Sequence, residues 1–324
     1  MSNVLVLDAG GTISSQADAR GVLSGGQGLA LGAGAGDTRL SLQQVHAGLS
    51  DELSLADAAA IVRAAQAAAD GAGDLAGIVV AHGTDTMEET AFLADLVWTS
   101  PLPLVFTGAQ RAPAHPAFDG TKNLADAVAL AANPAARDRG VLLAFGGRVM
   151  PARHAVKAHT SDLTGFADRQ GEAGSSGDIL ARLPRLQDRP AALSDLRMDP
   201  TVEILAASLG SGGGLIDAAV AQRSRGIVIQ ALGRGNASPP VVAAVGRACA
   251  AGVVVLVASR CPFGQVAPDY ASGARMADAG AIFSADLGAS QARILLSAML
   301  GLETSGDAAA ARLRAWLAPQ ALGR

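Results

Sequence analysis

Short runs of β-branched and other apolar residues alternate along the chain with longer, alanine-rich stretches, and this alternation limits the fold more than any other feature. We expect strands over residues 3–8, 77–82, 103–108, 140–147, 202–208, 226–232, 252–259 and 279–285. We expect helices over residues 57–70, 86–97, 120–132, 213–222, 239–251 and 289–300. Strands that alternate with helices in this way predict an α/β fold, with a mainly parallel sheet covered by helices on both faces.

The alternation is interrupted over residues 183–199, where the stretch LPRLQDRPAALSDLRMD loses the apolar pattern and carries prolines and charges. Such a composition is typical of a linker between domains. We therefore expect two domains, a larger N-terminal one over residues 1–182 and a smaller C-terminal α/β domain over residues 200–324.

Composition excludes several classes of partner. The chain has 324 residues, half of them hydrophobic, which is enough for a large core. Its formal net charge of -4 and its 17% of charged residues provide no basic surface, so we expect no nucleic acid and no membrane as a partner. The N-terminus enters a strand without a basic leader, and no apolar run reaches the length of a membrane span. These features favour a soluble, cytoplasmic protein.

Cysteine and histidine usage gives no sign of a metal centre. Cys249 and Cys261 form neither a disulfide framework nor a metal-binding pair, which is consistent with reduced thiols in a cytosol. None of His82, His154 and His159 shows the spacing of a zinc site. We expect no metal and no cofactor.

The stretch HGTDTMEET places polar residues between an expected strand and an expected helix. Thr86 and Glu89 have the spacing of a capping box, and Glu88 suits the positive end of the helix dipole. Helix initiation does not explain Thr84 and Asp85, which follow the strand directly. Because ligands bind at the carboxyl ends of strands in open α/β sheets, these two residues are candidates for a binding or catalytic site.

A second polar stretch, LDAGGTIS, ends the first strand. Its glycines let the backbone turn sharply, and Thr12 then presents a hydroxyl at the sheet edge where Thr84 lies. An ordinary strand-to-helix turn explains the stretch equally well. So does the phosphate-binding loop with which sugar kinases of the actin-like superfamily begin.

Taken in order, the motifs decide among these interpretations. The segments DAGGTI and HGTDTMEET resemble the two signatures of the bacterial-type L-asparaginase and glutaminase-asparaginase family. The resemblance continues through TGAQRAP (107–113), HAVKAHTSD (154–162), ALGRGN (231–236) and VASRCPFG (257–264), so it spans nearly the whole chain. A kinase would leave these four segments unexplained.

The resemblance implies a threonine amidohydrolase that acts on L-asparagine, with L-glutamine or another amide as alternative substrates. Thr12 would attack the side-chain amide carbon, releasing ammonia and forming an acyl-enzyme. Thr84, Asp85 and Lys157 would form a second catalytic group that helps to activate the deacylating water, because a lysine beside a carboxylate can be tuned for proton transfer. A catalytically silent relative that only binds an amino acid remains an alternative.

The family pattern also implies a set of residues that bind substrate. Asp85 would face the α-ammonium group, and Ser50 and Asp51 the α-carboxylate, although a polar loop is an equally good interpretation of Asp51. The full substrate-binding set is Ser50, Asp51, Gly11, Gly83, Ala109, Asn236 and Tyr270. The backbone N–H groups around Gly83 are expected to stabilise an oxyanion, and Ala109 to lie near the leaving amide.

Residues of the second domain enter this interpretation through a homo-oligomer, either a dimer or a tetramer, in which neighbouring chains complete each other's sites. Asn236 matches a family position near the site of the adjoining subunit, but it also suits a turn. Tyr270 lies where the family usually has a glutamate, and the alternative for it is simple packing at an interface.

One departure from the family concerns the activation of the nucleophile. The loop after Thr12 lacks the tyrosine that usually contacts it, since Tyr270 is the only tyrosine in the chain. Gln16, Arg20 or a water molecule are open candidates for that role.

Overall fold

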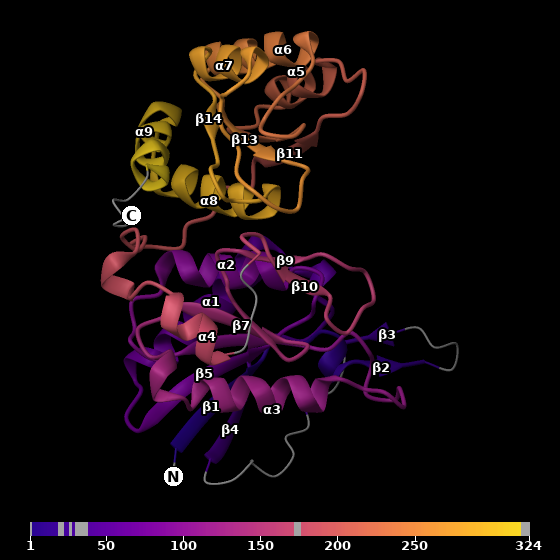
Figure 1. The fold of residues 1–324 in the computed structure, drawn as a ribbon, viewed down its shortest axis with the longest axis vertical. Coiled ribbons are helices and arrows are strands. Elements are labelled where there is room, and N and C mark those ends of the chain that lie inside the picture. Colours follow the sequence, from indigo (N-terminus) through magenta and orange to yellow (C-terminus); the bar gives the residue numbers. More distant parts are fainter. Residues whose placement is uncertain (1, 19–22, 26–27, 30–37, 172–175, 319–324) are drawn as a thin grey trace. The chain divides into compact units, whose positions relative to one another are not determined.

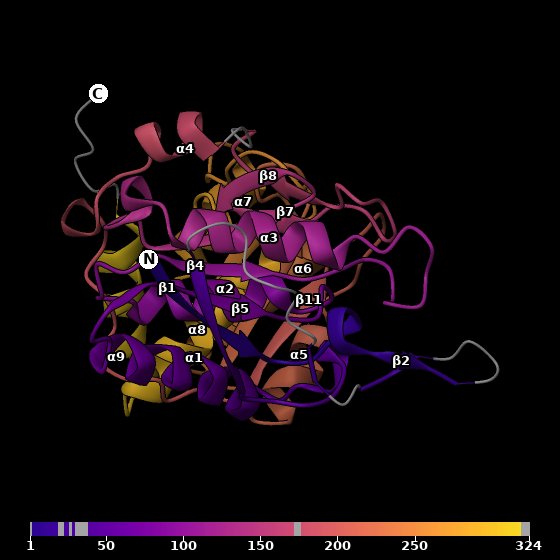
Figure 2. The same cartoon turned by 90° about the horizontal axis from the view of Figure 1, so that it is seen from below.

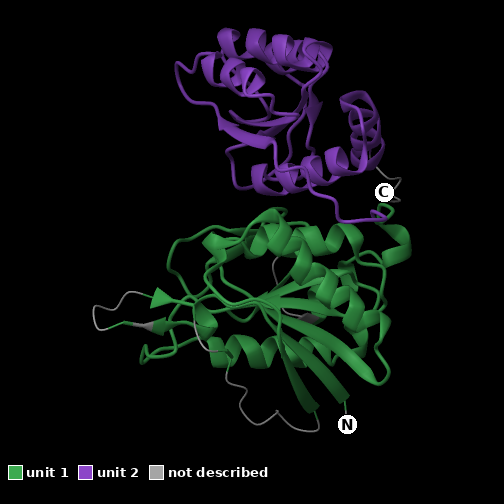
Figure 3. Cartoon of the chain, turned by 180° about the vertical axis from the view of Figure 1, so that it is seen from behind, with its two compact units in different colours: residues 1–192 green, residues 193–324 purple. Residues whose placement is uncertain are grey.

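The protein is described by a computed structural model that divides into two compact units, residues 1–192 (unit 1) and residues 193–324 (unit 2), coloured separately in Figure 3. The described residues are 2–18, 23–25, 28–29, 38–171 and 176–318. Two units, the N-terminal one larger, confirm the expected division. The exact boundaries at 182 and 200 stay a prediction.

Unit 1 is built on a sheet in the order β4-β1-β5-β6-β7-β8, in which only β8 runs antiparallel to its neighbour among the described strands. The strands are β1 (Ser2–Asp8), β4 (Thr38–Gln44), β5 (Leu75–Ala81), β6 (Leu104–Thr107), β7 (Val141–Phe145) and β8 (Arg148–Pro151). Asp8 pairs with Ala81 and Ala81 with Thr107, so β1, β5 and β6 end at the same edge.

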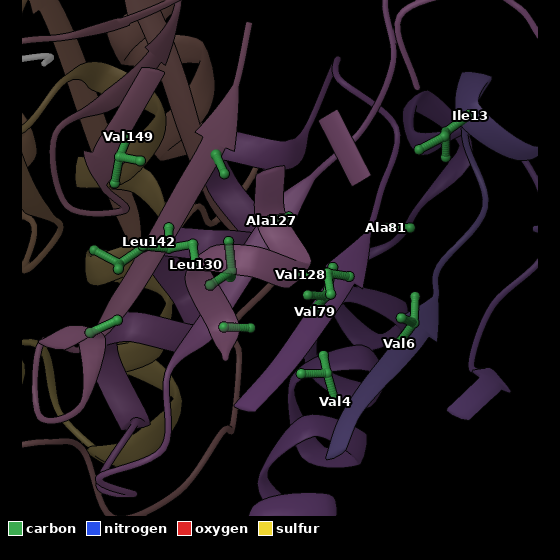
Figure 4. Packing of buried hydrophobic residues seen from close by; sticks show 14 of the residues in the cluster. Val4, Val6, Ile13, Val79, Ala81, Ala127, Val128, Leu130, Leu142 and Val149 are labelled. Atoms are coloured by element: carbon green, nitrogen blue, oxygen red, sulfur yellow. The ribbon is translucent and has the colours of Figure 1, made fainter. Parts of the chain in front are cut away.

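Helices cover both faces of this sheet (Figure 1 and Figure 2). They are α1 (Leu55–Asp70), α2 (Met87–Val97), α3 (Gly120–Ala131) and α4 (Ser176–Arg182). Figure 4 shows one of the two packed layers, in which Val4, Val79 and Leu142 of the strands meet Val128 and Leu130 of α3. Because alternate strand residues point to opposite faces and both sets are buried, the strands read as continuous apolar runs.

Shorter elements surround the ends of these strands. Two antiparallel pairs lie outside the main sheet, β2 (Gln16–Ala17) with β3 (Leu23–Ser24) and β9 (Ala155–Lys157) with β10 (Phe166–Asp168). Single 3-10 turns occur at η1 (Thr12–Ser14), η2 (Ser50–Glu52), η3 (Pro134–Ala136) and η4 (Leu186–Asp188). The first two of these turns, together with β9, carry residues predicted for the site.

Unit 2 has a smaller parallel sheet in the order β11-β12-β13-β14. Its strands are β11 (Val202–Ala206), β12 (Gly226–Ala231), β13 (Val254–Ser259) and β14 (Ile282–Phe283). Its helices are α5 (Gly214–Ala221), α6 (Pro239–Ala250), α7 (Ala271–Asp278), α8 (Ala289–Leu302) and α9 (Gly306–Leu317). The α/β fold predicted for this half is therefore confirmed.

All eight expected strands and all six expected helices occur, with both ends within two residues of the expected ones in every element except β14. The elements that the sequence did not indicate are β2, β3, β4, β8, β9, β10, α4, α7 and α9. For β4 the reason is its sequence, TRLSLQQ, which has two apolar residues and lies partly exposed at the sheet edge. Its position is set by pairing with β1 rather than by burial.

The expected linker, residues 183–199, is divided between the units. Its first part is attached to unit 1 by Arg189, which forms a largely buried ion pair with Asp95. Asp95 also accepts a hydrogen bond from the N–H of Val141 at 3.1 Å. The second part belongs to unit 2, where Leu193 and Leu196 are buried.

Every helix among the described residues falls short of the length and apolar character that a membrane span requires.

Candidate active site

The candidate site lies where β1, β5 and β6 end. These strands continue into three loops, which contain residues 10–12, 82–84 and 108–110. Because the strands are parallel and in register, their loops emerge side by side at the edge where α/β proteins bind ligands. The two stretches singled out from the sequence therefore meet in space.

A contact between two glycines fixes the distance between the loops. A Cβ atom on Gly11 would lie 2.2 Å from the Cα and 2.3 Å from the nitrogen of Gly83, closer than any side chain allows. Gly11 has a φ of +84°, which L-residues rarely adopt. A Cβ atom on Gly83 would in turn lie 2.5 Å from Oγ of Ser50. Thr12 and Thr84, one residue after these glycines, are positioned by this contact.

Thr12 begins the 3-10 turn η1 and is half-buried. Its carbonyl oxygen accepts hydrogen bonds from the N–H and the hydroxyl of Ser15. Among the residues that the structure describes, none forms a hydrogen bond with the Thr12 hydroxyl. Gln16 is exposed on β2, and Arg20 lies outside the described residues. The group that activates Thr12 stays a prediction.

Asp8 supports the turn before Thr12, a role that the sequence analysis missed. Its buried carboxylate accepts hydrogen bonds from the N–H of Gly10 at 3.0 Å and the N–H of Leu29 at 2.7 Å. Oγ of Ser14 donates to the same group at 3.4 Å. The available signal was a lone carboxylate ending an apolar strand, directly before the glycines.

The structure brings Thr84, Asp85 and Lys157 together, although Lys157 lies more than seventy residues away along the chain. Nζ of Lys157 donates to Oγ1 of Thr84 at 2.8 Å and to Oδ1 of Asp85 at 2.5 Å. Thr84 is 5% exposed, whereas the Asp85 side chain is 61% exposed. The cluster therefore has a buried hydroxyl end and a carboxylate end that a ligand can reach.

Glu88 holds the backbone that carries Lys157. Oε2 of Glu88 accepts a hydrogen bond from the N–H of Lys157 at 2.5 Å, and Glu88 is only 8% exposed. Its position in the first turn of α2 agrees with the helix-dipole interpretation. The contact with β9 was not expected, because sequence spacing does not indicate which distant strand a helix contacts.

The capping-box interpretation of Thr86 is wrong. Thr86 is the N-cap of α2, but its hydroxyl makes no capping hydrogen bond. It donates instead to the backbone carbonyl of Ser50 at 2.8 Å. Thr86 thus joins the helix start to the turn η2, which carries two of the predicted substrate-binding residues.

The remaining predicted residues differ in accessibility. In unit 1, Ser50 is buried at the start of η2, Asp51 is exposed beside it, and Ala109 is fully buried in the core. In unit 2, Oδ1 of Asn236 accepts a hydrogen bond from Ser272 at 3.0 Å, near the start of α7. Tyr270, the N-cap residue of α7, is 59% exposed. Asn236 and Tyr270 therefore occupy one neighbourhood within unit 2.

His82 orients the peptide bond between Gly83 and Thr84. The His82 ring is fully buried, and its Nδ1 donates to the carbonyl oxygen of Gly83 at 2.8 Å. In a trans peptide the N–H points opposite to the carbonyl, and no described residue accepts from the N–H of Thr84. That N–H is therefore available to stabilise an oxyanion.

Burial also keeps His82 neutral. It lowers the pKa of His82 from 6.5 to about 4, although the hydrogen bond to Gly83 acts in the opposite direction. Nε2 of the ring is buried and has no hydrogen-bond partner among the described residues. A proton on this nitrogen would be costly.

Comparison with known proteins agrees with this geometry. The family model for the N-terminal domain of asparaginase matches residues 3–184, and that for the glutaminase/asparaginase C-terminal domain matches residues 201–313. A probable L-asparaginase of Deinococcus radiodurans is 37% identical in an alignment of 242 residues that covers 71% of this chain and 72% of that protein. An L-asparaginase of Bacillus licheniformis is 34% identical over 235 residues, covering 71% and 73%.

Solved structures are similar over nearly the whole length. The thermostable L-asparaginase from Thermococcus kodakarensis superposes with a TM-score of 0.85 over 98% of both chains, at 23% identity. A probable cytoplasmic L-asparaginase from Campylobacter jejuni superposes with a TM-score of 0.77 over 98% of this chain and 99% of that one, at 26% identity.

Fold and site together define a two-domain α/β protein whose sheet edge carries two threonines, a lysine and a carboxylate. The two family models match both halves of the chain in order, and the first of them spans the residues that build this edge. The chain belongs to the asparaginase family, which confirms the resemblance seen in the sequence.

The glycine contact predicts that Gly11→Ala destabilises the protein more than backbone strain alone would. A positive φ costs an alanine about 1–2 kcal/mol, and the overlap with Gly83 should add roughly 1–3 kcal/mol. Gly147→Ala is the matched control, since Gly147 has a φ of +75° but open space where its Cβ would lie. The free energy of unfolding in urea measures both. Equal losses in the two variants would contradict the proposed contact.

The buried His82 predicts a loss of stability on acidification. As the pH falls below 6.5, the unfolded chain binds a proton at this histidine while the native protein, with a pKa of about 4, does not. The free energy of unfolding should therefore decrease by up to about 3 kcal/mol between pH 7 and pH 4. His82→Gln should show a shallower pH dependence than wild type, whereas His115→Gln, at an exposed site, should keep the wild-type slope. Identical slopes for all three proteins would be evidence against this role of His82.

Proposed function

We propose that this protein is an amidohydrolase that releases ammonia from the side-chain amide of L-asparagine and gives L-aspartate through an acyl-enzyme on Thr12. The observation that carries the proposal is the meeting of the Thr12 loop with the Thr84–Asp85–Lys157 cluster across the glycine contact. The names of the relatives, all L-asparaginases, support the same substrate. L-glutamine or another amide is the alternative substrate.

The reaction would proceed in two steps, acylation of Thr12 and hydrolysis of the acyl-enzyme. Oγ1 of Thr12 attacks the amide carbon, the C–N bond breaks, and the hydroxyl proton leaves with the nitrogen as ammonia. A water oxygen then attacks the ester carbon, and the bond to Oγ1 of Thr12 breaks. One water proton returns to Thr12, the product leaves as a carboxylate, and the second water proton is taken up by the released ammonia or by solvent. The N–H of Thr84 would stabilise the oxyanion in both steps.

The second group, Thr84, Asp85 and Lys157, would serve the water step. Lys157 donates to both of its partners, so it polarises the Thr84 hydroxyl and fixes Asp85. Asp85 remains exposed enough to bind the α-ammonium group of an amino acid. These roles follow from charge and from hydrogen-bond direction.

The other unit 1 residues would shape the substrate pocket. We assign the α-carboxylate to Ser50 and to the backbone N–H of Asp51, because the Asp51 carboxylate itself would repel it. Gly11 and Gly83, whose missing side chains let these loops and Ser50 approach closely, would place their backbone beside the substrate, and the fully buried Ala109 would limit the space beside the leaving amide.

We also propose that the protein works in the cytoplasm, without a cofactor. The relative from Campylobacter jejuni is named a probable cytoplasmic enzyme, whereas one from Haemophilus influenzae is named periplasmic. Cys249 and Cys261 are both free cysteines, which favours a reducing compartment such as the cytoplasm. The cluster of threonine and lysine residues supports hydrolysis more directly than it supports the two alternatives. These are an actin-like kinase, which needs ATP and magnesium, and a silent binding protein.

The nucleophile is tested by Thr12→Ala, which should lower ammonia release from L-asparagine by roughly three orders of magnitude or more while the protein still folds. Thr12→Ser should keep part of the activity, because it keeps a hydroxyl. Thr304→Ala, an exposed threonine of unit 2, is the matched control and should behave as wild type. Assays with L-asparagine, L-glutamine and D-asparagine, without nucleotide or metal, also separate hydrolase, kinase and silent relative. Wild-type ammonia release by folded Thr12→Ala would refute the mechanism.

We propose further that the enzyme is a homo-oligomer in which unit 2 of one chain completes the site of its neighbour through Tyr270 and Asn236. Tyr270 is exposed and can donate a hydrogen bond, but it lacks the charge that a glutamate would offer to an ammonium group. We therefore expect Tyr270→Phe mainly to raise KM. Asp85 would then carry most of the recognition of the α-ammonium group.

Subunit mixing tests this sharing. Thr12→Ala chains and Tyr270→Phe chains, dissociated and reassembled together, should show more activity at low substrate than the sum of the two separate proteins. In a mixed pair, the intact Thr12 of one chain meets the intact Tyr270 of the other. No gain on mixing, or an unchanged KM in Tyr270→Phe, would overturn the shared role.

A further inference from the structure

Gln110 contacts the Thr84 hydroxyl from the third strand end of the site. Oγ1 of Thr84 donates to Oε1 of Gln110 at 3.2 Å, and Nε2 of Gln110 donates to the carbonyl oxygen of Asp162 at 3.0 Å. A Cβ on Gly165 would lie 2.7 Å from this Nε2, so a glycine there leaves the space that the amide occupies.

The surroundings determine which way the Gln110 amide faces. A backbone carbonyl such as that of Asp162 can only accept a hydrogen bond, so the NH2 side of the amide must point toward it. The oxygen side is then left facing Thr84. The N–H of Gln110 itself donates to Oδ2 of Asp119 at 3.0 Å, which fixes the other end of the residue.

This orientation leaves the Thr84 hydroxyl with one lone pair for a reactant. A hydroxyl has one proton and two lone pairs. The Thr84 proton is directed to Gln110, and one lone pair accepts from Lys157. The remaining lone pair can only accept, so toward a reactant Thr84 acts as an acceptor and not as a donor.

We propose that Gln110 is a positioning residue that sets the polarity of the Thr84 hydroxyl, so that it accepts an O–H from the water that hydrolyses the acyl-enzyme. This inference rests on the proposed hydrolase function. In this role, Gln110 contacts neither the substrate nor the water molecule. Without the Gln110 acceptor, the Thr84 proton is free to turn toward the water, and the water loses the acceptor that orients it.

The test compares water with hydroxylamine, a stronger nucleophile that depends less on an orienting acceptor. Both attack the acyl-enzyme, giving aspartate from water and aspartyl hydroxamate from hydroxylamine, and both return the proton to Thr12. Gln110→Met, which keeps the length but removes the acceptor, should raise the ratio of hydroxamate to aspartate about 5- to 10-fold. Gln222→Met, an exposed glutamine at the end of α5, should leave the ratio unchanged.

A double variant separates positioning from packing. In a Thr84→Val background, Gln110→Met should change the ratio no further, because the hydroxyl through which it acts is gone. Provided that the wild-type protein is active, three results would overturn the inference. They are an unchanged product ratio in Gln110→Met, an equal loss of both products in that variant, or the same change of the ratio when Gln110→Met is made in the Thr84→Val background. Inactive wild-type protein would instead overturn the proposed function. The double-mutant cycle of Gln110→Met and Thr84→Val can also be measured by thermal unfolding, which needs no activity. If the hydrogen bond between the two residues exists, the changes in Tm should be non-additive.

Discussion

The site depends on the close approach of two backbone segments, those of Gly11 and Gly83. Neither position has room for a methyl group, and Gly11 also has a φ that other residues avoid. Because each glycine directly precedes a threonine, their contact sets the distance between the two hydroxyl-bearing loops. The parallel register of β1 and β5 brings the loops to the same edge, and the glycines allow them to touch. A side chain at either glycine would separate Thr12 from the cluster around Thr84.

Around this contact, several buried or half-buried polar side chains bind the backbone of the loops. The carboxylate of Asp8 binds the N–H groups of Gly10 and Leu29, Glu88 binds the N–H of Lys157, and Thr86 binds the carbonyl of Ser50. Each bond satisfies a buried polar group that would otherwise cost about 1–3 kcal/mol. These bonds help to give the loops one geometry.

The sequence predicted the fold well because burial on both faces makes the strands continuous apolar runs, and it missed β4 because that strand is held at an exposed edge. Thr84 and Asp85 could be found from their place after a strand. Lys157 could not be found in this way. It was assigned to the site only by resemblance to a family, and its contact with Thr84 is visible only in the structure. Glu88 and Gln110 show the general reason: a local pattern gives a residue's element but not its partner from a distant one.

The two threonines differ in the freedom of their hydroxyls, and this difference agrees with the separate roles proposed for them. Thr84 is fixed by Lys157 and Gln110, which use its proton and one lone pair. No described residue holds the hydroxyl of Thr12, which begins a short 3-10 turn. A nucleophile must give up its proton and move toward carbon, so a hydroxyl held on two sides is poorly suited to that role. A group that orients water gains from being fixed, because its lone pair then points in one direction. The same residue type therefore suits both proposed roles, and the surrounding hydrogen bonds agree with Thr12 as the proposed nucleophile and Thr84 as the proposed group that orients water.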